Sequence, residues 1–172
     1  TIRRIIHGES IPAYKGVPVF PQFKNALHVA PLKFRPDLPL IRSWDFGYLH
    51  PAVVYSNLFK CTYRTNHYFT LSEISDASNV NVYTLYKDYV IPHTQALYSN
   101  ATLIRDCGDR SGYRQSSSNK DRRSDMKILI DEYHLPFKHS YMHLTPSLQY
   151  MRGLLQPKEP CQQLFQQYFS QS

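Results

Sequence analysis

Leu38-Pro-Leu-Ile-Arg-Ser-Trp-Asp-Phe-Gly47 is the stretch that decides the fold, because an apolar run leads directly into a carboxylate and a turn. With Ala52-Val-Val-Tyr55 it predicts two strands, at about 38–46 and 52–59, joined through Gly47 and Pro51. Strands so close in sequence pair as an antiparallel hairpin. Asp45 then occupies a strand position, where an ionised carboxylate is costly unless it is paired, hydrogen-bonded or bound to a cation.

The residues after this hairpin predict a mixed sheet with helices on its faces, an α/β fold. A third strand is expected at Tyr68–Ile74. Apolar residues at three-to-four spacing then predict a helix from Asn79 to Leu97, which Pro92 should kink or break. The run Ala101–Ile104 predicts a strand, and the helical crossover should lay it parallel to a strand already in the sheet.

The two ends of the chain are expected to differ in character. We expect residues 1–36, with β-like pieces at 17–20 and 26–29, to be an N-terminal extension packed on one domain, residues 37–172. Within that domain the pattern predicts a mobile loop at 107–123, a helix capped by Ser124 and ending at Tyr133, an edge strand at 136–139, a helix at 146–155 and a helical continuation at 159–172.

Composition narrows the class of partner. The 172-residue chain carries 20 Lys+Arg against 13 Asp+Glu, and the resulting net charge of +7 favours a nucleic acid or another polyanion. No apolar run reaches membrane-spanning length, so we expect no membrane partner. The three cysteines form no CxxC pair, which indicates a reducing compartment. The missing initiator Met suggests an excised fragment, and the absence of a phosphate-binding glycine loop argues against ATP hydrolysis.

Two carboxylates at strand positions suggest a metal site. If the later strand pairs with the first one, Asp106 should lie beside Asp45, and the pair could hold Mg²⁺ or Mn²⁺, as two ions, for phosphodiester hydrolysis. Asp109, three residues beyond Asp106, is a further candidate ligand. The alternative is that each Asp caps a turn at a strand end. Asp125 is interpreted more simply as a helix-start residue.

Basic residues follow Asp106 in the sequence and suggest contacts to a phosphate backbone. The candidate DNA-binding residues are Lys120, Arg122, Arg123 and Arg110, with His50 added because it follows Asp45 on the same turn. The alternative for the charge run is a solvated surface loop. Phosphate contacts carry no sequence information, so little base specificity is expected.

Several segments resemble the nuclease domain of tailed-bacteriophage terminase large subunits. The most specific is Trp44-Asp-Phe-Gly47 followed by His50-Pro-Ala-Val53. The supporting segments, in the same order along the chain, are Gly16–Phe23, Leu27–Val29, Asp106–Gly108 and Tyr150–Leu155. The resemblance covers most of the chain.

The resemblance implies a ribonuclease H-like fold and a metal-dependent endonuclease that cuts concatemeric double-stranded viral DNA during packaging. It makes Asp45 and Asp106 the catalytic metal ligands. The implied partners are the packaging ATPase domain of the same protein, the portal and the small terminase subunit, in the host cytoplasm and transiently at the prohead. The family's third acid has no match here, since Glu159 is flanked by Lys158 and Pro160, so we expect it beyond Ser172.

Two alternatives remain beside the endonuclease. One is a related ribonuclease H-like recombination nuclease. The other is a non-catalytic DNA-binding or motor-docking module whose acids are structural.

Overall fold

The structure of the protein is a computed structural model that describes residues 18–47, 49–60, 66–114, 122–139 and 144–156. By their internal contacts, residues 31–144 form one compact unit, and residues 1–30 with 145–172 form another. The expected extension, residues 1–36, packed on a domain of residues 37–172, stays a prediction.

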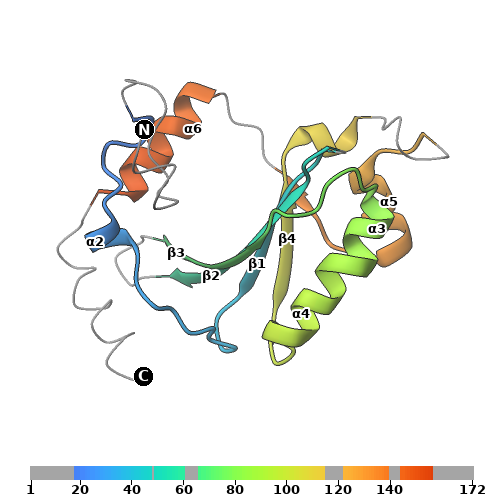
Figure 1. Ribbon diagram of the computed structural model, residues 1–172, viewed down its shortest axis with the longest axis horizontal. Helices are drawn as coiled ribbons and strands as arrows, with labels where there is room; N and C mark the ends of the chain where they lie inside the picture. The colour runs from blue at the N-terminus through green and yellow to red at the C-terminus, as the bar shows by residue number, and fades with distance from the viewer. Residues whose placement is uncertain (1–17, 48, 61–65, 115–121, 140–143, 157–172) are drawn as a thin grey trace, which may run out of the picture. The chain divides into compact units, whose positions relative to one another are not determined.

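Residues 31–144 fold around a five-stranded mixed sheet in the order β3-β2-β1-β4-β5 (Figure 1). The strands are β1 (Leu40–Asp45), β2 (Ala52–Lys60), β3 (Asn66–Ile74), β4 (Ile104–Gly108) and β5 (Lys138–His139). The first three pair antiparallel, as the short hairpin connections predict, while β4 lies parallel to β1 and β5 parallel to β4. The predicted mixed sheet and edge strand are confirmed.

Helices cover one face of this sheet (Figure 1). A continuous helical segment consists of α3 (Val82–Thr84), the π-helix η1 (Leu85–Val90) and α4 (Ile91–Tyr98). Pro92 does not break it, because Pro92 lies in the first turn of α4 directly after the π-helical turns. A proline has no N–H to donate, and the π-helix already departs from regular α-helical hydrogen bonding at this point.

The helix α5 (Asp125–Tyr133) starts where the sequence predicts. Ser124 is its N-cap, with its hydroxyl accepting a hydrogen bond from the Lys127 N–H at 3.3 Å. Met126, Ile128 and Leu129 are fully buried, so the helix packs through its apolar face. The helix ends at His134, which takes a left-handed conformation with φ 53°.

The strand β4 begins three residues later than predicted, and this shift changes the position of Asp106. Residues 101 and 102 belong to the turn after α4: Ala101 N–H donates to the Tyr98 carbonyl, and the Thr102 hydroxyl donates to the Pro36 carbonyl. The strand therefore runs through Ile104–Gly108, and Asp106 lies at its centre instead of beyond its end. The bounds expected for this strand, 101–104, are therefore wrong, whereas its expected parallel pairing with a strand of the sheet is confirmed by its pairing with β1.

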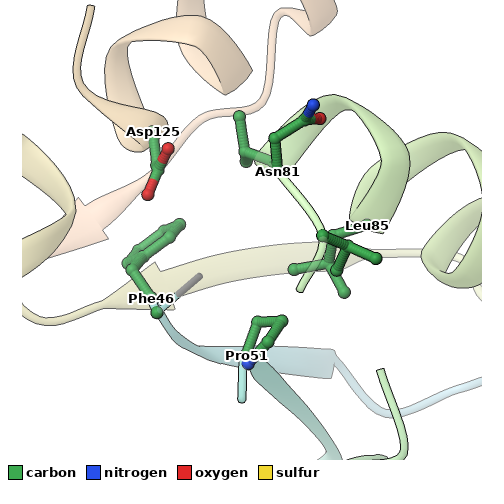
Figure 2. Close-up of a pocket in the computed structure, with 8 residues that line it drawn as sticks. Phe46, Pro51, Asn81, Leu85 and Asp125 are labelled. Atoms are coloured by element: carbon green, nitrogen blue, oxygen red, sulfur yellow. The ribbon is translucent and has the colours of Figure 1, made fainter. Parts of the chain in front are cut away.

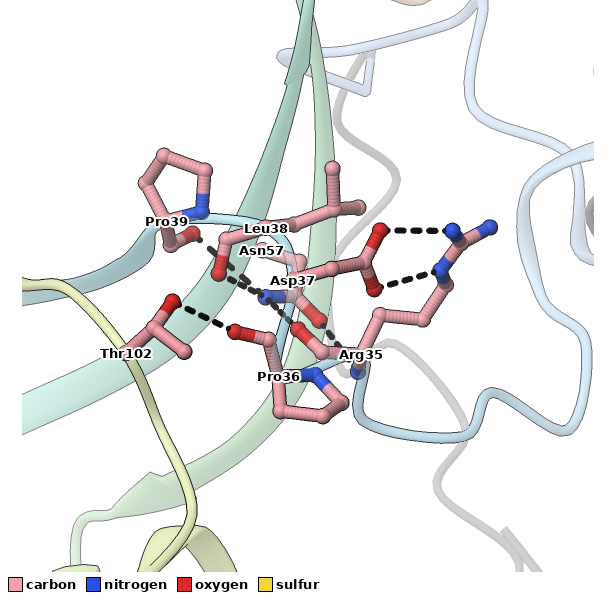
Figure 3. Close-up of polar contacts among 7 residues, drawn as sticks. All are labelled: Arg35, Pro36, Asp37, Leu38, Pro39, Asn57 and Thr102. Atoms are coloured by element: carbon pink, nitrogen blue, oxygen red, sulfur yellow. Dashed lines mark hydrogen bonds and ion pairs between the residues drawn. The ribbon is translucent and has the colours of Figure 1, made fainter.

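A buried amide fixes the chain where it enters β1 (Figure 3). The Asn57 side chain accepts a hydrogen bond from Arg35 N–H at 3.0 Å and donates to the Arg35, Leu38 and Pro39 carbonyls at 3.2–3.4 Å. Asn57 is fully buried on β2, and its polar atoms are satisfied by this bend. These bonds hold the start of β1 in register with β2.

The second unit contains α2 (Asn25–His28) and α6 (Leu144–Leu154, of which residues from Thr145 on belong to this unit). The expected β-like piece at 26–29 is wrong, because residues 25–28 form a helical turn that closes by hydrogen bonds to the Lys24 carbonyl. The predicted helix at 146–155 is confirmed by α6, whereas residues 159–172 lie outside the described residues. No helix in the described parts of the chain is long and apolar enough to cross a membrane.

Candidate metal and DNA site

The motif Trp44-Asp45-Phe46 sends its side chains to alternate sides of the sheet. The rings of Trp44 and Phe46 stack with centroids 6.0 Å apart, and both contact Phe137 on the helix-covered face. Gly108 lies against Phe46, since a Cβ there would come within 2.6 Å of the ring. Asp45 is the last residue of β1 and is exposed. Its carboxylate is therefore not the buried acid that the motif suggested.

Asp106 is the buried acid, at 1% exposure. Its Oδ1 accepts hydrogen bonds from Arg42 Nε and Trp44 Nε1, and its Oδ2 accepts one from Arg42 Nη2, all at 2.8 Å. This is a bidentate ion pair with an added indole donor, the strongest kind of carboxylate hydrogen bonding. The two aligned strands supply all of these groups, because Arg42 is the β1 partner of Asp106 in the parallel register.

Arg42 keeps its positive charge although it is buried. Burial by itself would lower the pKa of the Arg42 guanidinium, but the hydrogen bonds and the negative charge of Asp106 outweigh it and raise the pKa above its ordinary value. The charge of Arg42 is balanced by the Asp106 carboxylate, with which it forms an ion pair.

The expectation that Asp106 lies beside Asp45 is wrong. The register pairs Arg42 with Asp106 and Trp44 with Gly108, so Asp45 is three residues further along the sheet than Asp106. The two acids also face opposite sides. Side chains alternate along a strand, so Asp45 shares its face with Ser43, whose hydroxyl lies 3.3 Å from the Cys107 thiol. One ion cannot be held by both carboxylates in this arrangement.

The acid that the register does bring to Asp45 is Asp109. Continuing the pairing of Trp44 with Gly108 by one residue places Asp109 opposite Asp45, at the edge where both parallel strands end. Asp109 is exposed and starts the short 3₁₀-helix η2 (Arg110–Tyr113), with its Oδ1 accepting hydrogen bonds from the Ser111 N–H and hydroxyl. No hydrogen bond reaches the Asp45 carboxylate from any residue that the structure describes.

These two carboxylates fit a hard divalent cation in part. Mg²⁺ and Mn²⁺ prefer carboxylate oxygens and commonly keep several waters, so one or two protein acids can suffice to hold one. Among the described residues, however, no three His, Cys, Asp or Glu side chains gather closely enough to form a complete metal site. Any further ligand would have to come from other residues.

A small cavity lies on the helix side of the same edge (Figure 2). The Asp125 carboxylate and the Phe46 ring lie on one side of it, with Asn81 and Leu85 opposite. Its volume is about 10 Å³, which is room for roughly one water. Asn81 is occupied as the N-cap of α3, accepting a hydrogen bond from Thr84 N–H at 3.0 Å. Asp125 is the first residue of α5, as predicted.

The predicted DNA-binding residues have different surroundings. Arg122 and His50 are exposed, Arg122 with a left-handed φ of 56°. Arg123 is held by the chain itself: its Nη2 donates to the Tyr83 hydroxyl at 3.0 Å and pairs with Glu132. Lys120 lies outside the described residues, and the side chain of Arg110, in η2, is likewise not described.

The residue that sequence reasoning missed is Arg42. It alternates with Leu40 and Trp44, and period-two alternation alone would have placed it on the buried face with them. A buried arginine needs a carboxylate partner, so this pattern pointed to Asp106 as its counter-charge.

Comparison with solved structures shows which known fold this chain has. The chain is similar to the large terminase of a thermophilic bacteriophage, with a TM-score of 0.60 and 12% sequence identity. The alignment covers 80% of this chain and 32% of that one. This chain has a terminase-like fold. Its mixed sheet flanked by helices agrees with the expected ribonuclease H-like class. No protein-family model and no curated protein matches the sequence.

The terminase-like match spans about a third of the phage terminase, at 32% of its length. At 12% identity the likeness concerns the fold and leaves the activity open.

Proposed function

We propose that this chain is the nuclease part of a terminase-like packaging protein, a metal-dependent endonuclease that cuts concatemeric double-stranded DNA with little sequence preference. The observation that carries the proposal is the edge where β1 and β4 end together, at the pair Trp44 and Gly108, with the exposed acids Asp45 and Asp109 as the next residue of each chain segment. The terminase-like fold supports DNA as the substrate.

At this edge Asp45 and Asp109 would hold Mg²⁺ or Mn²⁺, as one or two ions. When bound, the metal supplies a nucleophilic hydroxide near neutral pH and stabilises the leaving oxygen. Asp109 is oriented for this task by its two hydrogen bonds from Ser111, which leave its second oxygen available. Asp106 takes no direct part, and instead fixes the register of β1 and β4 through Arg42.

Exposed basic groups would contact the DNA backbone. Arg122 and His50 are the described candidates, with Lys120 and Arg110 completing the set that the sequence suggests. Arg123 serves mainly to tie the start of α5 to Tyr83 and Glu132. With a net charge of +7, the chain should bind DNA with an affinity that falls steeply as salt increases.

The chain spans about a third of the large terminase that it resembles, so its partners belong to the proposal. They are a packaging ATPase domain of the same protein, a portal and a small terminase subunit. The place of action would be the host cytoplasm, at the prohead during packaging.

The burial of Asp106 favours a second candidate, a non-catalytic DNA-binding or motor-docking module. One of the two acids expected to be catalytic, Asp106, is buried and accepts three hydrogen bonds from Arg42 and Trp44, which favours a structural role. A docking module would bind DNA with the same salt dependence and show no metal-linked cleavage.

Cleavage of a supercoiled plasmid in Mn²⁺ or Mg²⁺ tests the endonuclease. Asp45→Asn and Asp109→Asn should each lower cleavage at least about a hundredfold, since even outer-shell changes cost roughly 10–100-fold at metal sites. Asp88→Asn, an exposed acid on η1 away from the edge, is the matched control and should cut normally.

Metal binding gives a second readout that does not need turnover. Mn²⁺ should raise the melting temperature of the wild-type chain by mass action, and the rise should disappear in Asp45→Asn. Full cleavage by Asp45→Asn would overturn the site. Salt-dependent DNA binding without cleavage or a metal-linked rise in melting temperature would establish the docking module instead.

A further inference from the structure

A second cavity lies on the helix-covered face of the sheet, away from the edge carboxylates. It has a volume of about 320 Å³, within the range of roughly 300–1,000 Å³ typical of small-molecule sites. Its wall is mostly apolar, formed by Tyr86, Ile91 and Ile104 with Leu135 and Pro136. Its polar part consists of the ion pair Arg42–Asp106 with Thr94 and Gln95. A mainly apolar cavity with a few convergent polar groups is the usual form of a ligand site.

Arg42 has hydrogen-bond donors left over that reach this cavity. Its Nε and Nη2 are bound side-on by Asp106, while within the described structure nothing accepts a hydrogen bond from Nη1. The residue is 95% buried, at 5% exposure, and it lines the cavity. Nη1 is not among the fully buried atoms that lack a partner, so it keeps a small accessible surface. The N–H groups of Nη1 and the second N–H of Nη2, which point away from the Cδ end of the guanidinium, are therefore open to a ligand.

The charge balance fixes the class of ligand. Arg42 and Asp106 neutralise each other, so an anion would gain little net attraction, and Asp106 already accepts three hydrogen bonds from strong donors. A neutral molecule with two adjacent hydrogen-bond acceptors suits the open N–H groups of Arg42. Tyr86, supplied by the rare π-helix η1, adds an aromatic wall for a flat molecule. π-helical turns of this kind are frequent at functional sites.

We propose that this cavity binds a nucleobase, with guanine preferred. Guanine presents adjacent O6 and N7 acceptors, the commonest bidentate partner of an arginine fork. An unstacked base in such a cavity is held by hydrogen bonds on its edge and by aromatic or apolar walls. The choice of a base rests on the proposed action on DNA, whereas the neutral, flat and acceptor-bearing character of the ligand rests on the cavity alone. The preference for guanine concerns binding in this cavity, whose lining contains neither Asp45 nor Asp109, and not the position of the cut.

Calorimetric titration of the full 172-residue chain with deoxynucleosides tests the proposal. A chelator in the buffer removes divalent metal, so cleavage contributes nothing and the result is independent of the endonuclease assay. Deoxyguanosine should bind at least about fivefold more tightly than deoxyadenosine or thymidine, as a good bidentate pair discriminates. A single-stranded thymidine oligonucleotide with one central guanine shows whether a base within DNA can also enter.

Blocking variants locate the binding. Ile91→Trp, in the wall, and Gln95→Trp, at an exposed position of the rim, should each reduce deoxyguanosine binding at least tenfold. Leu97→Trp is the matched control, because it adds the same ring to the same helix at a residue that is 53% exposed and outside the cavity. Equal binding of all nucleosides, no binding, or binding that survives in Gln95→Trp would overturn the proposal. Arg42 itself is not varied, since its loss would threaten the fold.

Discussion

Asp106→Asn is the substitution that best separates a structural acid from a catalytic one. Asparagine keeps the shape and can still accept a hydrogen bond from Trp44, but its amide N–H₂ would face an Arg42 donor. The guanidinium, at 5% exposure, would then lie in the interior without a counter-charge. Breaking one side of a buried ion pair typically destabilises a protein by about 3–5 kcal/mol.

The assay is thermal or urea unfolding of the metal-free chain. For a protein of this size, each kcal/mol shifts the melting temperature by roughly 2–4 °C, so Asp106→Asn should lower it by about 6–20 °C. Asp45→Asn is the matched control. It changes an exposed acid at the end of the neighbouring strand and should alter stability by no more than about 0.5 kcal/mol.

A double variant tests whether the loss comes from the unpaired charge. Arg42→Met with Asp106→Leu replaces both partners by apolar side chains, and such replacements are often neutral or stabilising. The double variant should therefore recover most of the stability lost in Asp106→Asn. A metal-binding carboxylate behaves in the opposite way, since removing it from an empty site relieves repulsion. Unchanged or increased stability of Asp106→Asn would refute the structural role.

Three further outcomes follow from local contacts. Gly112→Ala should destabilise by about 1–3 kcal/mol in urea unfolding, because its Cβ would come within 2.5 Å of the Phe46 ring, and the loss should shrink when Phe46 is also changed to Leu. Ser124→Ala removes the cap of α5 and should cost about 1 kcal/mol by the same assay, with Ser124→Asp as the retaining control. Burial lowers the pKa of His93 below its ordinary value of 6.5, so the folded chain binds a proton at this residue less readily than the unfolded chain does. The free energy of unfolding should therefore fall as the pH drops below 6.5. In His93→Gln the melting temperature should depend less on pH in this range.

Local periodicity predicts most of the sheet and helices. The hairpin of β1 and β2 follows from two apolar runs and a turn, and α5 follows from Ser124 and its apolar face. The bounds of β4 were not predictable in the same way. The apolar run Ala101–Ile104 has the composition of a strand, but Ala101 and Thr102 form a turn instead. Ala101 bonds to Tyr98, and Thr102 bonds to Pro36, which is 66 residues away in sequence.

The partner of Asp106 could be predicted only in part. Alternation places Arg42 on the buried face of β1, but the residue opposite it depends on the parallel register, which is set between strands 64 residues apart. Because β4 begins three residues later than expected, Asp106 lies at the centre of this strand instead of beyond its end. Continued by one residue, the same register places Asp109, which the sequence suggested as a further ligand, opposite Asp45.

The strand carboxylate that is costly to bury is Asp106 and not Asp45. Burial penalises a carboxylate that faces the core, and this fold meets the penalty at Asp106 with three hydrogen bonds from Arg42 and Trp44. An acid whose lone pairs are already used by a guanidinium has little capacity left for a cation. The endonuclease proposed above would therefore rely on acids that the fold does not need for itself, and Asp45 and Asp109 meet that condition because both are exposed at the shared end of β1 and β4.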